Sequence, residues 1–157
     1  MKVIIHGGFF SESNTNQETK KAKQDALAHV VKQSHEFLKN HTALETVVYA
    51  VSLLENNELF NAGIGSQIQS DGKVRLSAAL MDGSTQKFSG VINLENIKNP
   101  IQVAKSLLSY EDRVLSGNGA LTFARDHGFA HYNPITAQRQ AEYEDKLNQQ
   151  NNIGTVG

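Results

Sequence analysis

The sequence predicts a mixed fold of the α+β class. Two segments with helical periodicity each open on a pair with capping-box spacing, Thr15 with Glu18 and Thr42 with Glu45. Two later segments alternate as strands do, with a hairpin signal between them. Hydrophobic residues make up 39% of the 157 residues, enough to bury one core, so we expect one domain or a large piece of one.

The first third of the chain is expected to form a strand and two helices. The apolar run Val3-Ile4-Ile5 leads into His6-Gly7-Gly8 and predicts a short buried strand followed by a turn. Apolar residues at steps of three and four over residues 15–38 predict an amphipathic helix of about six turns. Residues 42–54 predict a second helix that is apolar on most sides and should therefore be buried against a sheet.

The middle of the chain predicts a hairpin after a loop rich in Gly and Asn at residues 56–71. Two segments alternate on either side of Asp82-Gly83, which is a hairpin signal. The apolar positions are Val74, Leu76, Ala78 and Leu80 in residues 73–81, and Phe88, Ile92 and Leu94 in residues 88–94.

Shorter elements follow the hairpin. Asn99-Pro100 predicts the start of a helix through residue 108, since proline suits the first turn. Val114-Leu115 predicts a short strand, residues 116–119 a turn, and residues 120–126 a helix that ends at Gly128. From about residue 129 the chain is rich in Gln, Asn, Glu and Arg, which predicts a mobile linker with at most one solvated helix.

Composition narrows the classes of function. Fifteen Lys and Arg against sixteen Asp and Glu give a net charge of −1 without a basic stripe, which argues against a nucleic-acid partner. The absence of cysteine excludes disulfides, thiolate metal sites and a cysteine nucleophile. The N-terminal residues lack the apolar length of a signal peptide or a membrane span, so we expect a cytoplasmic protein without a membrane partner.

The last residues are Gly154-Thr155-Val156-Gly157. A Gly-Thr bond just past a polar stretch is typical of the processing site of a self-cleaving N-terminal-nucleophile hydrolase, in which the threonine hydroxyl becomes the nucleophile. A frayed C-terminal tail is the other interpretation of these residues taken alone.

Four blocks, in order, carry a resemblance: Val3-Ile4-Ile5-His6-Gly7-Gly8, Leu59-Phe60-Asn61-Ala62-Gly63-Ile64-Gly65-Ser66, Met81-Asp82-Gly83 and Gly154-Thr155-Val156-Gly157. With them the chain resembles the plant-type asparaginase and isoaspartyl peptidase family, a branch of the N-terminal-nucleophile hydrolases. The resemblance implies an αββα sandwich, of which this chain is the N-terminal half. It implies an α-subunit half at residues 1–128, a linker at 129–154 that ends at the cleavage site, and the start of the β-subunit at 155–157.

The resemblance also implies the chemistry. The Thr155 hydroxyl would attack the Gly154 carbonyl, and hydrolysis of the resulting ester would free the Thr155 amine as a general base. The hydroxyl would then attack the side-chain amide of L-asparagine or of a β-aspartyl dipeptide and form an acyl-enzyme. The implied partners are the chain's own β-subunit and a second copy of the αβ unit, and no cofactor is required.

Two supporting sites come from the same resemblance. Asn61 matches the asparagine that hydrogen-bonds near the nucleophile. A sodium ion is implied in the loop that contains it, held by main-chain carbonyls, because backbone oxygens suit a hard cation. The matching carbonyls belong to Leu54, Glu55, Asn57, Phe60, Ala62 and Ile64.

The chain departs from the family pattern in two places. Phe9-Phe10 follows His-Gly-Gly, where relatives have small residues, and this change is expected to slow self-cleavage. Ser77-Ala78-Ala79 stands where relatives commonly carry Asp-Ala-Ser, so the hydrogen bonds of that carboxylate are missing.

The sequence also fits a glycosylasparaginase-like hydrolase, a non-catalytic αβ binding module or an inactive α fragment. The six histidines show no zinc-ligand spacing, and a strand-end residue such as His6 is more often structural. Gly63-Ile64-Gly65 and Gly117-Asn118-Gly119 lack the third glycine of a dinucleotide loop and indicate turns.

Overall fold

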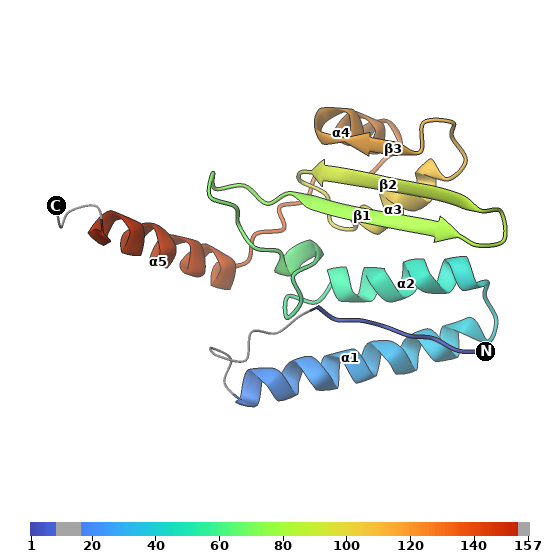
Figure 1. Ribbon diagram of the computed structural model, residues 1–157, viewed down its shortest axis with the longest axis horizontal. Coiled ribbons are helices and arrows are strands. Elements are labelled where there is room, and N and C mark those ends of the chain that lie inside the picture. Colours follow the sequence, from blue (N-terminus) through green and yellow to red (C-terminus); the bar gives the residue numbers. More distant parts are fainter. Residues whose placement is uncertain (9–16, 154–157) are drawn as a thin grey trace.

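The computed structural model describes residues 1–8 and 17–153, and side chains as far as residue 149. Figure 1 shows the helices and strands of this part of the chain. In order they are α1 (Gln17–Leu38), α2 (Ala43–Glu55), the 3-10 turn η1 (Gly63–Gly65), β1 (Leu76–Asp82), β2 (Lys87–Leu94), α3 (Pro100–Leu107), β3 (Val114–Ser116), α4 (Gly117–Asp126) and α5 (Ala137–Ile153). The mixed order of helices and strands confirms the α+β class.

The strands form one sheet in the order β1-β2-β3. β1 and β2 are antiparallel and β3 runs parallel to β2. The Asp82 carboxylate closes the hairpin, because it accepts the Ser84 N–H at 2.9 Å and the Thr85 hydroxyl at 2.7 Å. The hairpin predicted at Asp82-Gly83 is therefore confirmed.

Helices cover one face of this sheet. The main cluster joins β2 to α3 and α4, and a second cluster joins α2 to β1 and α3. The buried members are Val91, Leu94, Ile97, Val103, Leu107, Ala120 and Ala124 in the first, and Val48, Leu80, Ile101 and Ala104 in the second. The burial predicted for residues 42–54 is confirmed on the side of α2 that carries Val48.

A β-bulge changes the phase of β2. Leu76 pairs with Leu94 and Ala78 with Val91, so β2 holds one more residue than β1 over the same length. Asn93 takes up the extra residue with a φ of 54°. Because of the bulge, Val91 and Leu94 both face the helices. The predicted alternation of Phe88, Ile92 and Leu94 is therefore wrong, because Leu94 faces the helices while Phe88 and Ile92 are exposed.

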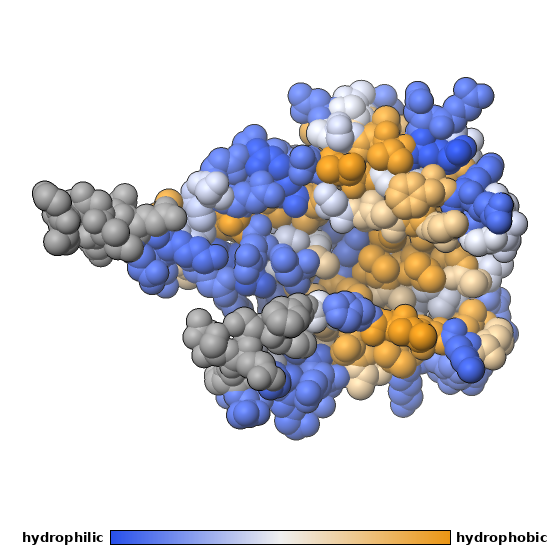
Figure 2. Space-filling view, in the orientation of Figure 1, coloured by the Kyte–Doolittle hydropathy of each residue, from blue (hydrophilic) through white to orange (hydrophobic). Residues whose placement is uncertain are grey.

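The other face of the sheet is open and apolar. Met81 lies opposite Phe88 across β1 and β2, and their exposed fractions are 64% and 49%. Ile92 and Val114 on the neighbouring strands are 47% and 48% exposed. Figure 2 shows apolar side chains gathered over the strands and over α2. We call Met81, Phe88, Ile92 and Val114 the open sheet face.

The N-terminal segment is not a strand. Residues 1–8 have no regular secondary structure, and Ile4 is 96% exposed. The segment runs along α2 and, with Leu38 and α2, lines an open apolar cavity of about 250 Å³. The buried strand predicted at Val3-Ile4-Ile5 is therefore wrong, since no strand of the described chain lies beside it to complete a ladder.

Helix ends follow the sequence closely. The capping box of α2 is formed, with the Glu45 N–H 3.2 Å from Thr42 Oγ1 and the Thr42 N–H 2.9 Å from Glu45 Oε2. The corresponding Thr15 lies outside the described residues. Gly128, whose φ is 80°, lies just past the end of α4 at Asp126, and the Phe129 N–H donates to the Ala124 carbonyl as in a Schellman motif.

Two elements begin three residues away from the predicted position. β1 begins at Leu76 rather than at residue 73, and α4 begins at Gly117, in the predicted turn, where φ is 51°. In the described part of the chain, no helix combines the length and the apolar character that crossing a membrane requires.

Candidate functional site

The site is built on the loop after α2, where the backbone turns back on itself. Gly63 has a φ of 53°, and a Cβ there would collide with the Glu55 carbonyl. A Cβ on Gly65 would collide with the Phe60 carbonyl. Only glycine fits either position, so the loop holds one tight backbone path.

Asn61 projects from this loop. Its side-chain Oδ1 accepts the Gln67 N–H at 3.0 Å. Because a main-chain N–H can only donate, the facing atom must be the oxygen, which fixes the orientation of the amide. Among the described residues none accepts a hydrogen bond from Nδ2, so this group is left as a fixed donor.

Asn61 borders an open cavity of about 610 Å³. The cavity is lined by His6, Gly7, Gly8, Lys23, Leu54, Leu59, Phe60, Asn61, Ala62, Gln67 and Arg139. The His-Gly-Gly turn reaches it because Gly7 packs on Phe60, where an added Cβ would lie 3.0 Å from Cε1 of the ring. The structure thus brings together the first two sequence blocks, and the lining residues described include cationic side chains and no acidic one.

Arg139, from α5, was not predicted as a site residue. Its Nε donates to the Gly65 carbonyl at 2.8 Å and its Nη1 to Glu142 at 2.7 Å, and its side chain is 13% exposed. The sequence gives only a weak signal, an Arg and a Glu three residues apart in a polar stretch. Its partner Gly65 lies 74 positions away, so local patterns could not identify this contact.

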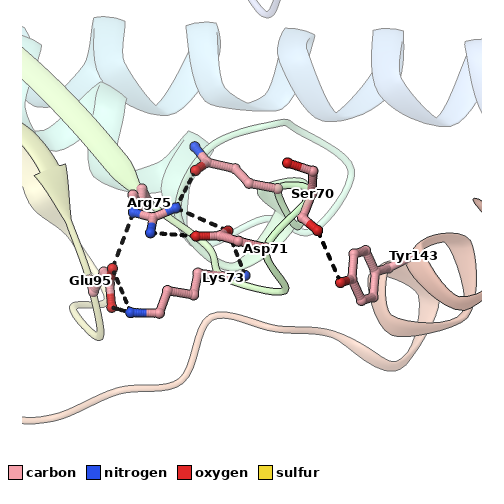
Figure 3. Close-up of polar contacts among 7 residues, drawn as sticks. Ser70, Asp71, Lys73, Arg75, Glu95 and Tyr143 are labelled. Carbon is pink, nitrogen blue, oxygen red and sulfur yellow. Dashed lines mark hydrogen bonds and ion pairs between the residues drawn. The ribbon is translucent and has the colours of Figure 1, made fainter. Parts of the chain in front are cut away.

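Tyr143, one helical turn later, makes a second contact between α5 and the site. Its hydroxyl donates to the Ser70 carbonyl at 3.4 Å (Figure 3), and a Cβ on Gly72 would lie 3.4 Å from the same hydroxyl. The first two turns of α5 are therefore attached to residues 65–72.

Ion pairs connect residues 71–75 of the chain before β1 to Glu95, which follows β2 (Figure 3). Arg75 pairs with Asp71 at 2.6 Å and with Glu95 at 3.2 Å, and Lys73 reaches Glu95 at 3.4 Å. The Arg75 guanidinium holds the pKa of Asp71 below its usual range, mainly through the hydrogen bonds. Because these groups are partly solvated, each pair adds little stability, and the network chiefly sets the path of the loop.

Glu55 ties the loop to α3 from inside the molecule. Its buried carboxylate accepts the Ile101 N–H at 3.1 Å and Asn99 Nδ2 at 3.0 Å, so it serves as the cap that Asn99 itself does not provide. Burial raises the pKa of Glu55 to about 7, although the two hydrogen bonds oppose the shift.

The carbonyls predicted to bind sodium lie in this loop. Those of Asn57 and Ala62 each accept one main-chain N–H at 3.1 Å, which leaves each a second lone pair, whereas that of Leu54 accepts the N–H groups of both Asn56 and Asn57. Within residues 1–8 and 17–153, no three His, Asp or Glu side chains gather as a metal site. The donors available in the loop are thus main-chain oxygens, which are suited to a hard cation, and the sodium ion stays a prediction.

Gly154, Thr155 and the pair Phe9-Phe10 lie outside the described residues. Ser77, at the position where the family commonly has a carboxylate, accepts the Asn93 N–H at 3.2 Å through its hydroxyl. This serine therefore supplies an acceptor for the bulge of β2.

Comparison with known proteins gives a consistent result. The family model described as asparaginase matches residues 1–156. An isoaspartyl peptidase/L-asparaginase of Synechocystis sp. is 44% identical over 146 residues, which are 92% of this chain and 44% of that protein. A plant-type L-asparaginase of Pyrococcus abyssi is 36% identical over 144 residues, covering 91% and 47% of the two chains.

An isoaspartyl peptidase of Salmonella typhimurium is 34% identical over 149 residues, covering 92% of this chain and 48% of that protein. The chain thus spans about half the length of the curated relatives it matches. With its four blocks in order and a family match over residues 1–156, the chain belongs to the asparaginase family.

Proposed function

We propose that this chain is the N-terminal part of a self-processing amidohydrolase acting on L-asparagine and β-aspartyl dipeptides. The observation that carries the proposal is the extent of the family match, which reaches residue 156 and so includes Gly154-Thr155. The relatives named above are an isoaspartyl peptidase/L-asparaginase, a plant-type L-asparaginase and an isoaspartyl peptidase. The cavity beside Asn61 supports the proposal with a fixed amide donor.

Processing follows from the chemistry of threonine. The Thr155 hydroxyl attacks the Gly154 carbonyl carbon, the peptide C–N bond breaks, and the released nitrogen takes the hydroxyl proton. Water then hydrolyses the ester, which leaves a carboxylate on Gly154 and a free amine on Thr155. In this scheme Asn61 Nδ2 donates to the threonine hydroxyl and orients it.

Turnover uses the same hydroxyl. The Thr155 amine accepts its proton while the oxygen attacks the side-chain amide carbon, and ammonia or the amine of the dipeptide leaves with a proton. Water releases aspartate from the acyl-enzyme. The described lining of the cavity has no acidic residue, so it does not repel substrates that carry carboxylates. The remaining groups come from the β-subunit, and two αβ units form the proposed homodimer.

We also propose that a sodium ion binds the loop at residues 54–64. The six carbonyls named above are its ligands, and the bends at Gly63 and Gly65 hold them in one short loop. Replacing sodium with tetramethylammonium at constant ionic strength is expected to lower the melting temperature of the complete protein. An unchanged melting temperature would contradict the sodium site.

The complete reading frame, expressed to its stop codon, tests the enzyme proposal. We expect two bands on a denaturing gel, the second with Thr155 as its N-terminal residue, and release of ammonia from L-asparagine. Thr155→Ala should stay uncut and inactive. If the Thr155→Ala protein is still cut at this bond, the proposed nucleophile is wrong.

Asn61 is tested by Asn61→Ala. We expect it to slow processing by about 10²-fold, since one oriented donor near the reacting oxygen is lost. Gln67→Ala serves as the matched control, because Gln67 binds Asn61 through its main-chain N–H and keeps that bond. Equal rates for Asn61→Ala and the wild type would exclude the role proposed for Asn61.

A further inference from the structure

α5 begins at the candidate site and leads away from it. Arg139 and Tyr143 attach its first two turns to residues 65–72, with contacts at 2.8 Å and 3.4 Å. Residues 144–149 are all exposed. Figure 1 shows the helix projecting from the body of the molecule, so that its C-terminal end lies far from the sheet.

This direction conflicts with the processing reaction. Gly154, the first residue of the scissile bond, follows Ile153 at the end of α5, whereas Arg139, near the start of α5, lines the cavity that should receive this bond. A straight helix from residue 139 to residue 153 rises about 21 Å, at about 1.5 Å per residue. Two further residues span at most about 7 Å. While all of α5 is helical, Thr155 therefore cannot reach Asn61.

We propose that α5 is a helical tether that limits self-cleavage, and that its last turn must unwind to deliver the Gly154-Thr155 bond to the cavity. The inference rests on the proposed function. An extended residue covers about 3.4 Å, so the chain can return to the level of Arg139 only if the helix ends near residue 150 or earlier. Arg139 and Tyr143 are positioning residues, because they fix where the tether starts.

The sequence of α5 fits this division into two halves. Among its described side chains, the pairs Gln138–Glu142, Arg139–Glu142 and Gln140–Glu144 support the first half. Residues 148–152 read Asn-Gln-Gln-Asn-Asn, and asparagine is a poor helix former. Side-chain pairs thus stabilise the first half of α5, which is attached to the loop. The last turn, which must unwind, has a low intrinsic helix propensity.

Helix propensity provides the test. In the complete protein, Asn148, Asn151 and Asn152 are replaced together by alanine or by glycine, and the rate of appearance of the cut chains is followed after synchronised cell-free translation. We expect the alanine variant to process roughly tenfold more slowly and the glycine variant about threefold faster, because the two residues stabilise and weaken the helix respectively. Lys146→Ala, a change between two good helix formers at an exposed position of α5, should alter the rate by less than about twofold.

The outcomes separate this inference from the proposed function. If neither the wild type nor any variant is cut, the proposed function fails. If the wild type is cut but the alanine variant is cut at the same rate, the tether inference is wrong. Equal slowing by alanine and glycine would also overturn it, since loss of the asparagine side chains would then be the cause. Once cut to completion, all variants should share the kcat/KM of the wild type, because Asn148, the first substituted position, lies about 13 Å along α5 from Arg139 in the cavity lining.

Discussion

Glu55 combines burial with an ionisable group, which makes stability depend on pH. Its pKa is about 7 in the folded protein, above its ordinary value of 4.5. Between these pH values the folded state holds a proton that the unfolded state has lost. The free energy of unfolding should therefore fall as pH rises from about 4.5 to about 7, with a slope of at most about 1.4 kcal/mol per pH unit.

Urea unfolding of the uncut Thr155→Ala protein at a series of pH values measures this slope. Glu55→Gln should flatten the dependence in that window, because a neutral amide has no proton to lose. The exposed Glu58 lies three residues away in the same loop, and Glu58→Gln should keep the slope. A slope that survives Glu55→Gln would assign the pH dependence to another group.

Gly63 offers a test of the loop backbone. Gly63→Ala places a Cβ against the Glu55 carbonyl at a φ of 53°, so we expect a loss of at least about 3 kcal/mol in the free energy of unfolding. Gly83→Ala is the matched control, since nothing lies within 4 Å of an added Cβ there. The midpoints of urea unfolding of the two variants measure this loss. Similar midpoints would show that the loop can shift to make room for the added Cβ.

At this scale the sequence identified residue types better than their contacts. The family blocks led to Asn61, but not to its bond with the Gln67 N–H, which depends on the path of the loop. Glu55 was named for its main-chain carbonyl, whereas its side chain caps α3 across a separation of 46 positions. Arg139 was missed for the same physical reason, because long-range contacts leave no local pattern.

The capping box of α2 is the clearest local feature among the elements. Thr42→Ala removes the side-chain acceptor for the Glu45 N–H and should lower the free energy of unfolding by about 1 kcal/mol. Thr122→Ala, at an exposed position within α4, should cause no loss, since alanine is the better helix former. Chemical denaturation of both variants measures the difference, and equal stabilities would mean that the box is not formed in solution.

Elements were predictable where local signals decide them. Gly128 ends α4 as expected, because a glycine at a positive φ can satisfy the last carbonyls of a helix. The phase of β2 was not predictable, since the bulge at Asn93 depends on pairing with β1. The run Val3-Ile4-Ile5 has strand composition, but whether it forms a strand depends on a neighbouring strand to pair with.

At the scale of the whole molecule, the open sheet face is an apolar surface that no helix of the described chain covers. In the αββα sandwich implied by the family, a second sheet would cover it. Ile92→Lys, at a position 47% exposed here, should then prevent the two cut chains from eluting together in size-exclusion chromatography of the complete protein. Val31→Lys, on α1 and 36% exposed, is the control that should leave co-elution intact. Normal assembly of Ile92→Lys would argue against a second sheet on this face.

The class of the fold could be predicted because local hydrophobic periodicity indicates the order of helices and strands. The sandwich came only from the family resemblance, since one three-stranded sheet with helices on a single face fits several architectures. The polar composition predicted a linker with at most one solvated helix, and residues 137–153 form one such helix, α5. The proposed unwinding of its last turn stays a prediction.

The exposed second half of α5 also affects how fragments of this protein are to be identified. A solvated polar helix end is a favourable substrate for contaminating proteases. Cleavage by a host protease within residues 144–153 would give two pieces almost equal in mass to the products of self-cleavage. The two kinds of product differ in the first residue of the C-terminal piece, which is Thr155 after self-cleavage and an earlier residue after degradation. N-terminal sequencing or an exact mass therefore distinguishes maturation from degradation.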